Sequence, residues 1–344
     1  MTIPQGTVGL SGQAGKGGIV PGRSFSGSMA GSRAGFALMV VIIILLIVSF
    51  LASQLILQVQ TEQKIAFNVK KKAYSRLLSE AGMQIALFRT LEPKTVVDEE
   101  DQLFQFIEGK TYDTFFNQGK ISYSTVNESG KIDLNRAPRQ LLELFCEYHG
   151  LEMEETGTLI DSLMDWRDSD DLLRLNGAEA NYYEELEDPY LPRNGEIEDP
   201  AEFLLIQGAE LLAEKFVVED VFTVNNSDGK INFNSLTPDM LAFLTEGDLD
   251  RQEVYHENQE LVGTLNQTHA RQVLGDERYE RLRPYLTFSS PNKFYSITSI
   301  GRAGVKPDEE TAEDQDQPGM KLQVLFRVKG STDYELLSWR ENHA

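Results

Sequence analysis

The sequence predicts an α+β fold: a long N-terminal helix, a sheet domain, and a large α-helical domain inserted between the first and last strands. Three observations support it. An uncharged apolar run over residues 36–53 continues into a helical pattern, and strand-like alternation occurs both near residue 120 and after residue 293. The stretch between them, residues 136–285, is mostly of helical type.

Residues 1–35 form a basic leader rich in Gly and Ser. The segment has three positive charges, Lys16, Arg23 and Arg33, and no acidic residue. It has too little apolar surface to offset the entropy cost of folding, so we expect it to be disordered.

Residues 36–57 are predicted to be a transmembrane helix. Phe36 to Ser53 are eighteen residues without a charge, enough to cross a hydrocarbon core as a helix. A cleavable signal peptide would have a shorter apolar region followed by a small-residue cleavage site. The basic leader favours a cytoplasmic N-terminus and a single-pass topology.

Residues 58–135 are predicted to hold an amphipathic helix and the first strands. Apolar residues three and four apart predict one buried stripe on this helix, which we expect to end before Pro93. The stripe contains Phe67, Tyr74, Leu77, Leu78, Ala81, Ile85 and Phe88. Alternation over 119–135, with turn residues at 127–130, predicts a β-hairpin.

Residues 136–285 form the predicted inserted domain, and residues 286–344 hold the closing strands. These strands are expected at 294–300, 322–328 and 334–339, with an acidic solvated loop at 308–316 between the first two.

An internal sequence repeat occurs twice, once at the start of the predicted helical domain and once within it. GKIDLNRAPRQLLELF (130–145) and GKINFNSLTPDMLAFL (229–244) align at an offset of 99 residues. We expect Asn135 and Asn234 to end a short strand and help to cap the next helix. Some helix-hairpin-helix DNA-binding modules open similarly, but neither copy has their Gly-rich hairpin. The net charge of -22 also argues against nucleic acid as a partner.

Between the repeats, residues 165–203 hold the densest group of carboxylates. Asp168, Asp170 and Glu179 fall at positions 1, 3 and 12 of an EF-hand-like loop, and oxygen ligands of this kind suit Ca²⁺. Positions 5 and 6 are leucines, so the loop is not an EF-hand, and backbone carbonyls or Asn181 would complete the shell. The candidate metal ligands are Asp165, Asp168, Asp170, Glu179 and Asn181.

The order of these features resembles the minor pseudopilin K family of type II secretion. Ser32-Arg33-Ala34-Gly35 before Phe36 resembles a prepilin processing site, and Val40 stands where most pilins have Glu. The acidic segment is similar to that family at Asp165-Trp166, Gly177-Ala178-Glu179 and Tyr182-Tyr183.

This resemblance implies cleavage between Gly35 and Phe36 by the prepilin peptidase and methylation of the new N-terminus. It implies an inner-membrane protein with a pilin-like periplasmic domain, a helical insertion and structural calcium. The family's role is at the tip of the pseudopilus, with other minor pseudopilins as partners, supporting export of folded proteins across the outer membrane.

Two other functions are possible from the residues alone. A membrane-anchored periplasmic hydrolase would use paired carboxylates such as Asp165 and Asp168, although no nucleophile or oxyanion site accompanies them. A pilin-like component for DNA uptake would need a basic surface. We therefore expect no catalytic residues and no enzyme activity.

Overall fold

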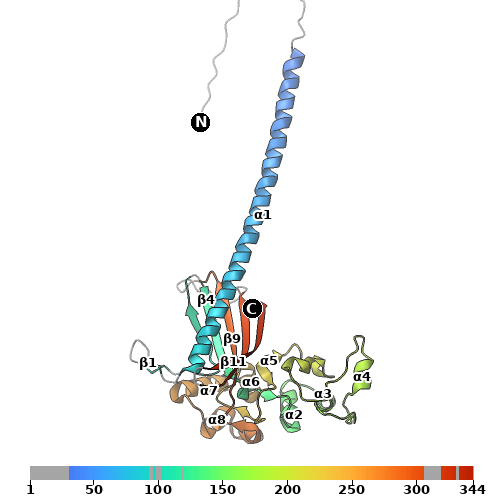
Figure 1. The fold of residues 1–344 in the computed structure, drawn as a ribbon, viewed down its shortest axis with the longest axis vertical. Coiled ribbons are helices and arrows are strands. Elements are labelled where there is room, and N and C mark those ends of the chain that lie inside the picture. The colour runs from blue at the N-terminus through green and yellow to red at the C-terminus, as the bar shows by residue number, and fades with distance from the viewer. Residues whose placement is uncertain are drawn as a thin grey trace, which may run out of the picture. The chain divides into compact units, whose positions relative to one another are not determined.

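The computed structural model describes residues 31–92, 96–97, 103–104, 106–117, 119–305, 319–330 and 333–343. The chain divides into two compact units, residues 1–65 and 66–344, and the fold is α+β, as predicted (Figure 1). Residues 1–30 of the predicted leader and the predicted acidic loop at 308–316 lie outside the described residues.

The first unit contains the N-terminal part of helix α1, which spans Gly31–Leu91. The helix begins four residues before Gly35, within the segment predicted to be disordered. Among the described residues, α1 is the one helix long and apolar enough to cross a membrane, with a mean hydropathy of 3.1 over its most apolar window. The apolar side chains from Phe36 to Val59 are exposed, which is compatible with a membrane anchor.

The second unit contains an antiparallel sheet of five strands within the described residues, in the order β11-β10-β9-β4-β3. The strands are β3 (Tyr112–Phe115), β4 (Gly119–Asn127), β9 (Phe294–Ala303), β10 (Met320–Val328) and β11 (Tyr334–His343). The three closing strands are confirmed. A short pair, β1 (Val96–Val97) and β2 (Leu103–Phe104), precedes the sheet.

The predicted hairpin over 119–135 is wrong. Strand β4 pairs with β9 and β3, and the chain leaves the sheet through a 3-10 turn at Glu128–Gly130. The next strand, β5 (Ile132–Asp133), pairs in parallel with β6 (Phe222–Thr223). Alternation identified β4 but not its partners, which are β3, immediately before it, and β9, about 170 residues later in the sequence.

The C-terminal part of α1 packs on one face of the sheet. Its buried apolar residues are Leu78, Met83, Ala86 and Leu87, which meet Ile121, Tyr123, Ile297, Leu322, Val324 and Phe326. The predicted stripe is therefore only partly correct: Leu78 is buried, Tyr74, Ala81 and Ile85 are half-buried, and Phe67, Leu77 and Phe88 are exposed.

Small residues explain which face of α1 is buried. A Cβ atom on Gly82 would lie 2.2 Å from the Ser299 Oγ atom, and a Cβ atom on Gly301 would lie 2.1 Å from the Ser75 carbonyl oxygen. Helix and sheet therefore approach so closely that only glycine fits at both contact points.

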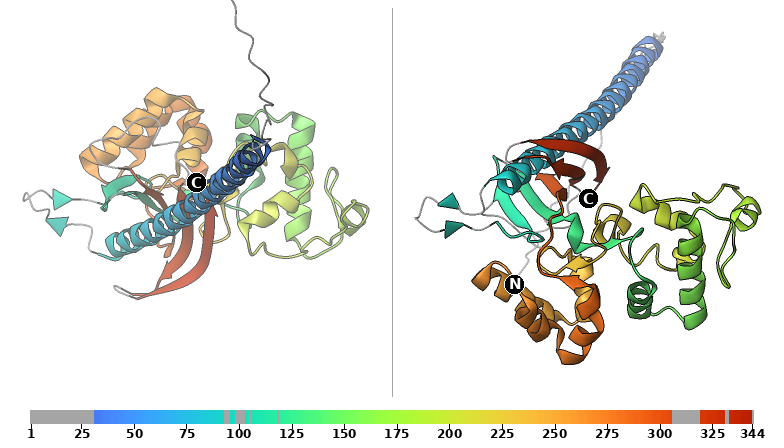
Figure 2. Two further views of the ribbon diagram at one scale, coloured as in Figure 1. Left: turned by 90° about the horizontal axis from the view of Figure 1, so that it is seen from above. Right: turned by 60° about the horizontal axis from the view of Figure 1, so that its bottom comes forward.

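The helical region lies between β4 and β9 in the chain. Its helices are α2 (Arg139–Tyr148), α3 (Met153–Arg167), α4 (Ala180–Glu184), α5 (Val218–Val221), α6 (Pro238–Thr245), α7 (Leu249–Val262), α8 (Gln267–Leu274) and α9 (Asp276–Leu282). Three 3-10 helices at 200–205, 209–211 and 283–285 complete it. Figure 2 shows two groups of helices, the green α2 and α3 in one and the orange α7–α9 in the other.

The two repeats form equivalent structures. Strand β5 precedes α2, and β7 (Ile231–Asn232), paired in parallel with β8 (Leu286–Thr287), precedes α6. Asn135 bridges the backbone N–H and carbonyl of Ile197, and Asn234 does the same for Leu265. Both asparagines therefore tie a distant loop to the end of a short strand. They do not cap the helices, whose N-cap residues are Pro138 and Thr237.

Candidate functional site

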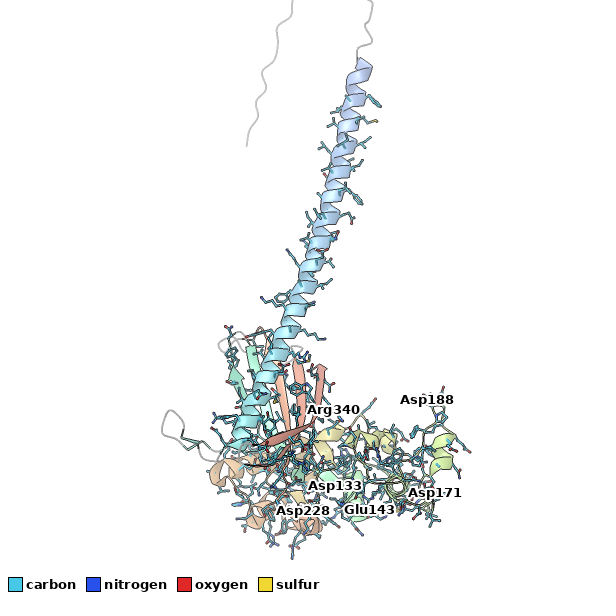
Figure 3. All side chains as sticks on the ribbon, viewed as in Figure 1. Asp133, Glu143, Asp171, Asp188, Asp228 and Arg340 are labelled. Carbon is cyan, nitrogen blue, oxygen red and sulfur yellow. The ribbon has the colours of Figure 1, made fainter. Side chains whose placement is uncertain are left out.

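The acidic segment joins the end of α3 to the start of α4. Helix α3 begins with a capping box between Glu152 and Glu155 and ends at its C-cap residue Asp168. Glu179 is the N-cap residue of α4, but its side chain makes no capping hydrogen bond. Asp171 and Asp188 of this segment lie at the outer end of the helical region, away from Arg340 on the sheet (Figure 3), whereas Asp199, near the end of the segment, forms an ion pair with Arg340.

Three of the predicted ligands, Asp165, Asp168 and Glu179, form one cluster. Asp165 is fully buried in the last turn of α3, and its Oδ2 atom accepts a hydrogen bond from the Arg174 backbone N–H at 3.2 Å. A Cβ atom on Gly177 would lie 1.8 Å from Asp165 Oδ2, so the loop closes on this carboxylate only because residue 177 is glycine.

Arg174 lies between two of these carboxylates. Its Nη1 atom donates to Asp165 Oδ1 and to Asp168 Oδ2, forming an ion pair with each. The hydrogen bond with Asp168 is the main cause of the raised pKa of the Arg174 guanidinium. One cation thus bridges two of the three carboxylates of the cluster, Asp165 and Asp168.

Glu179 is the least satisfied member of the cluster. The residue is 6% exposed, and neither side-chain oxygen has a hydrogen-bond partner. Burial, followed by the negative charges of Asp165 and Asp168, raises the pKa of its carboxyl to about 7. The Oδ1 atom of Asp168 is likewise buried and without a partner.

The other two predicted ligands are not brought into the cluster. Asp170 Oδ1 accepts a hydrogen bond from the Leu172 backbone N–H within its own loop, and Asn181 is exposed in α4. In the part of the chain that the structure describes, no three His, Cys, Asp or Glu side chains are arranged as a metal-binding group.

The cluster nevertheless has unpartnered oxygens of the kind that a hard divalent cation binds. Three buried carboxylate oxygens have no partner, one on Asp168 and two on Glu179. Buried polar atoms normally have partners, and Ca²⁺ takes 6–8 oxygen ligands. Asp165, Asp168 and Glu179 are therefore the residues that would hold calcium.

Sequence reasoning missed Arg174, although the sequence contains a signal for it. Arg174 is the one basic residue between Asp168 and Pro192, a stretch that has eight acidic residues when Asp168 is included. A lone cation in such a stretch is the expected counter-ion for buried carboxylates.

The predicted processing junction lies within the first unit. Gly35 and Phe36 are exposed residues near the beginning of α1, and a Cβ atom on Gly35 would meet nothing within 4 Å. Val40, at the position where a carboxylate was expected in most pilins, is one of the exposed apolar residues of the same helix.

Comparison with known proteins finds one family and one fold. Residues 116–213 match the family model described as type II secretion system (T2SS), protein K. No curated protein sequence matches the chain. A chain in the crystal structure of the GspK-GspI-GspJ complex from the enterotoxigenic Escherichia coli type 2 secretion system shares the fold. It has 15% sequence identity and a TM-score of 0.50, over 83% of this chain and 100% of that one. Over residues 116–213 the chain is therefore similar to protein K of the type II secretion system.

Proposed function

We propose that this chain is a minor pseudopilin of the type II secretion system, which occupies the tip of the pseudopilus and supports export of folded proteins from the periplasm across the outer membrane. In this role α1 anchors the chain in the inner membrane by a single span, with its N-terminus in the cytoplasm and residues 66–344 in the periplasm. The other minor pseudopilins of the tip complex are its partners, and its role is architectural rather than catalytic.

The observation that carries the tip position is the absence of a carboxylate at Val40. A buried carboxylate in lipid needs a partner, which in a stacked filament is the N-terminal amine of a neighbouring subunit. A subunit with Val at this position has no such requirement, so it needs no subunit above it. The helical region inserted between β4 and β9 adds bulk that would obstruct such a neighbour.

The proposal includes processing by the prepilin peptidase between Gly35 and Phe36, followed by methylation of the Phe36 amine. The intact mass of the chain extracted from membranes tests this step. A chain that begins at Phe36, with or without a methyl group, supports the proposal. A chain that retains residues 1–35, or is cut after Ser53, contradicts it.

The proposal also includes a structural calcium ion held by Asp165, Asp168 and Glu179. Two buried oxygens without a partner on Glu179 support it, because an unpaired buried carboxylate is costly and a cation removes that cost. Addition of CaCl₂ to chelator-treated protein is expected to raise its melting temperature, and the Glu179→Gln variant is expected to lose most of this response.

A further inference from the structure

The position of Arg174 determines how many carboxylate oxygens the cluster can offer to a cation. With the guanidinium in place, the cluster offers three side-chain oxygens without a partner: Asp168 Oδ1 and both oxygens of Glu179. Arg174 occupies two more, Asp165 Oδ1 and Asp168 Oδ2. Three oxygens are few for Ca²⁺, whereas five leave room for a shell completed by water or backbone carbonyls.

Asp165 Oδ1 and Asp168 Oδ2 cannot bind the Arg174 guanidinium and a calcium ion at the same time. A guanidinium bound to a carboxylate oxygen puts a positive charge within a few ångströms of the cation position. At that separation the guanidinium and the doubly charged Ca²⁺ repel each other strongly, because both lie in a largely buried cluster where water screens charges poorly. A calcium ion in the cluster and the guanidinium in its observed position therefore exclude each other.

The loop that carries Arg174 has no buried leucine that would hold it in place if the Arg174 side chain moved out of the cluster. Leu172, Leu173 and Leu175 are 75%, 64% and 94% exposed. The loop is held by polar contacts instead, among them those of Arg174 and the hydrogen bonds from Asn176 to Asp161 Oδ2. The Arg174 side chain is itself 37% exposed, so swinging it into solvent uncovers little apolar surface.

We propose that Arg174 is a built-in counter-ion that is exchanged for calcium: its guanidinium holds Asp165 and Asp168 together in the metal-free protein and leaves them when Ca²⁺ binds. This inference rests on the proposed calcium site. It assigns Arg174 as the residue that sets the affinity of the cluster for the metal, while keeping the metal-free protein folded.

The test measures calcium affinity by titration calorimetry with CaCl₂, and melting temperature in EGTA and in CaCl₂, on the detergent-solubilised full chain. Arg174→Gln removes the charge. Arg283→Gln is the matched control, because Arg283 also forms an ion pair, with Glu280, on a surface outside the cluster. Arg174→Lys keeps the positive charge and serves if the glutamine variant does not fold.

Arg174→Gln is expected to bind calcium about tenfold tighter than wild type, to melt at a lower temperature in EGTA, and to recover in saturating CaCl₂. Arg283→Gln is expected to match wild type in calcium affinity, and Arg174→Lys to bind no tighter than wild type. If wild type binds calcium and Arg174→Gln binds it equally or more weakly, the exchange is refuted while the calcium site stands. If none of the proteins binds calcium, both are refuted.

Discussion

Glu128 and Lys131 form a buried ion pair at the point where the chain passes from β4 into the first repeat. The residues are 3% and 4% exposed, and Lys131 Nζ lies 2.6 Å from Glu128 Oε1. Ser296 on β9 donates to the same carboxylate oxygen at 2.7 Å, and the Thr223 hydroxyl on β6 donates to the other. This ion pair therefore joins the sheet to the helical region.

Lys131→Met is expected to destabilise the protein by about 3–5 kcal/mol, because it leaves the Glu128 carboxylate buried without its counter-ion. Urea unfolding of the detergent-solubilised chain, followed by the fluorescence of buried Trp166, measures the change. Lys110→Met, which breaks the exposed ion pair with Glu260, is the control and should lose much less unfolding free energy. An equal loss of unfolding free energy in both variants would show that the buried Glu128–Lys131 pair stabilises the protein no more than an exposed pair does.

His149 is expected to make stability depend on pH in the acidic range. Burial, and secondarily the charge of Lys215, lowers the pKa of its imidazole to about 4 from a usual value of 6.5. Its ring packs against Phe145 and Phe216. Between pH 6.5 and 4 the unfolded chain binds a proton at this position that the folded chain does not, so stability falls as the pH is lowered through this window.

His149→Phe keeps the aromatic contacts and removes the titrating group. The free energy of unfolding of this variant should therefore fall less steeply than that of wild type between pH 6.5 and 4, although the carboxylates still titrate in both. Urea unfolding at several pH values measures the two slopes. Parallel slopes would show that His149 is protonated equally in the folded and unfolded chains.

At the scale of elements, the contact between α1 and the sheet depends on backbone proximity. Gly301→Ala would place a Cβ atom 2.1 Å from the Ser75 carbonyl oxygen and 2.5 Å from the Ser79 amide nitrogen. Backbone atoms cannot yield as a flexible side chain does, so we expect a loss of about 1–3 kcal/mol or more. Gly195→Ala, whose Cβ atom would meet nothing closer than 3.9 Å, is the control.

Urea unfolding of both alanine variants checks this expectation. Gly195→Ala should unfold at the wild-type midpoint and Gly301→Ala at a lower one. If Gly301→Ala is as stable as wild type, α1 can move away from β9 without loss, and the close approach is not what selects glycine.

The elements were predictable to different degrees. The closing strands and the repeats follow from local alternation and from matching residues, so the sequence was sufficient to find them. The buried face of α1 was mispredicted, because Ser75, Ser79 and Gly82 are buried by close approach to a sheet and not by hydrophobicity. In the acidic cluster, Asp165, Asp168 and Glu179 were predicted together, whereas the contacts of Arg174 depend on the fold of a loop without regular structure.

At the scale of the whole molecule, charge is distributed very unevenly. Residues 1–35 carry three basic residues and no acid, whereas the whole chain has a net charge of -22. The excess of negative charge therefore lies entirely after the apolar helix. Lys70, Lys71 and Lys72 follow the predicted span within the distance over which flanking charges influence orientation, so they partly oppose the leader charges.

The proposed orientation should therefore depend on the three leader charges. Replacing Lys16, Arg23 and Arg33 together by Gln is expected to reduce the fraction of chains whose residues 66–344 are digested by a protease added outside spheroplasts. Replacing Lys70, Lys71 and Lys72 by Gln removes the same charge on the other side of the span, and should leave that fraction unchanged or raise it. If the two triple variants were digested alike, the leader charges would not determine the topology, and orientation would have to come from the apolar helix itself or from the proteins that insert it.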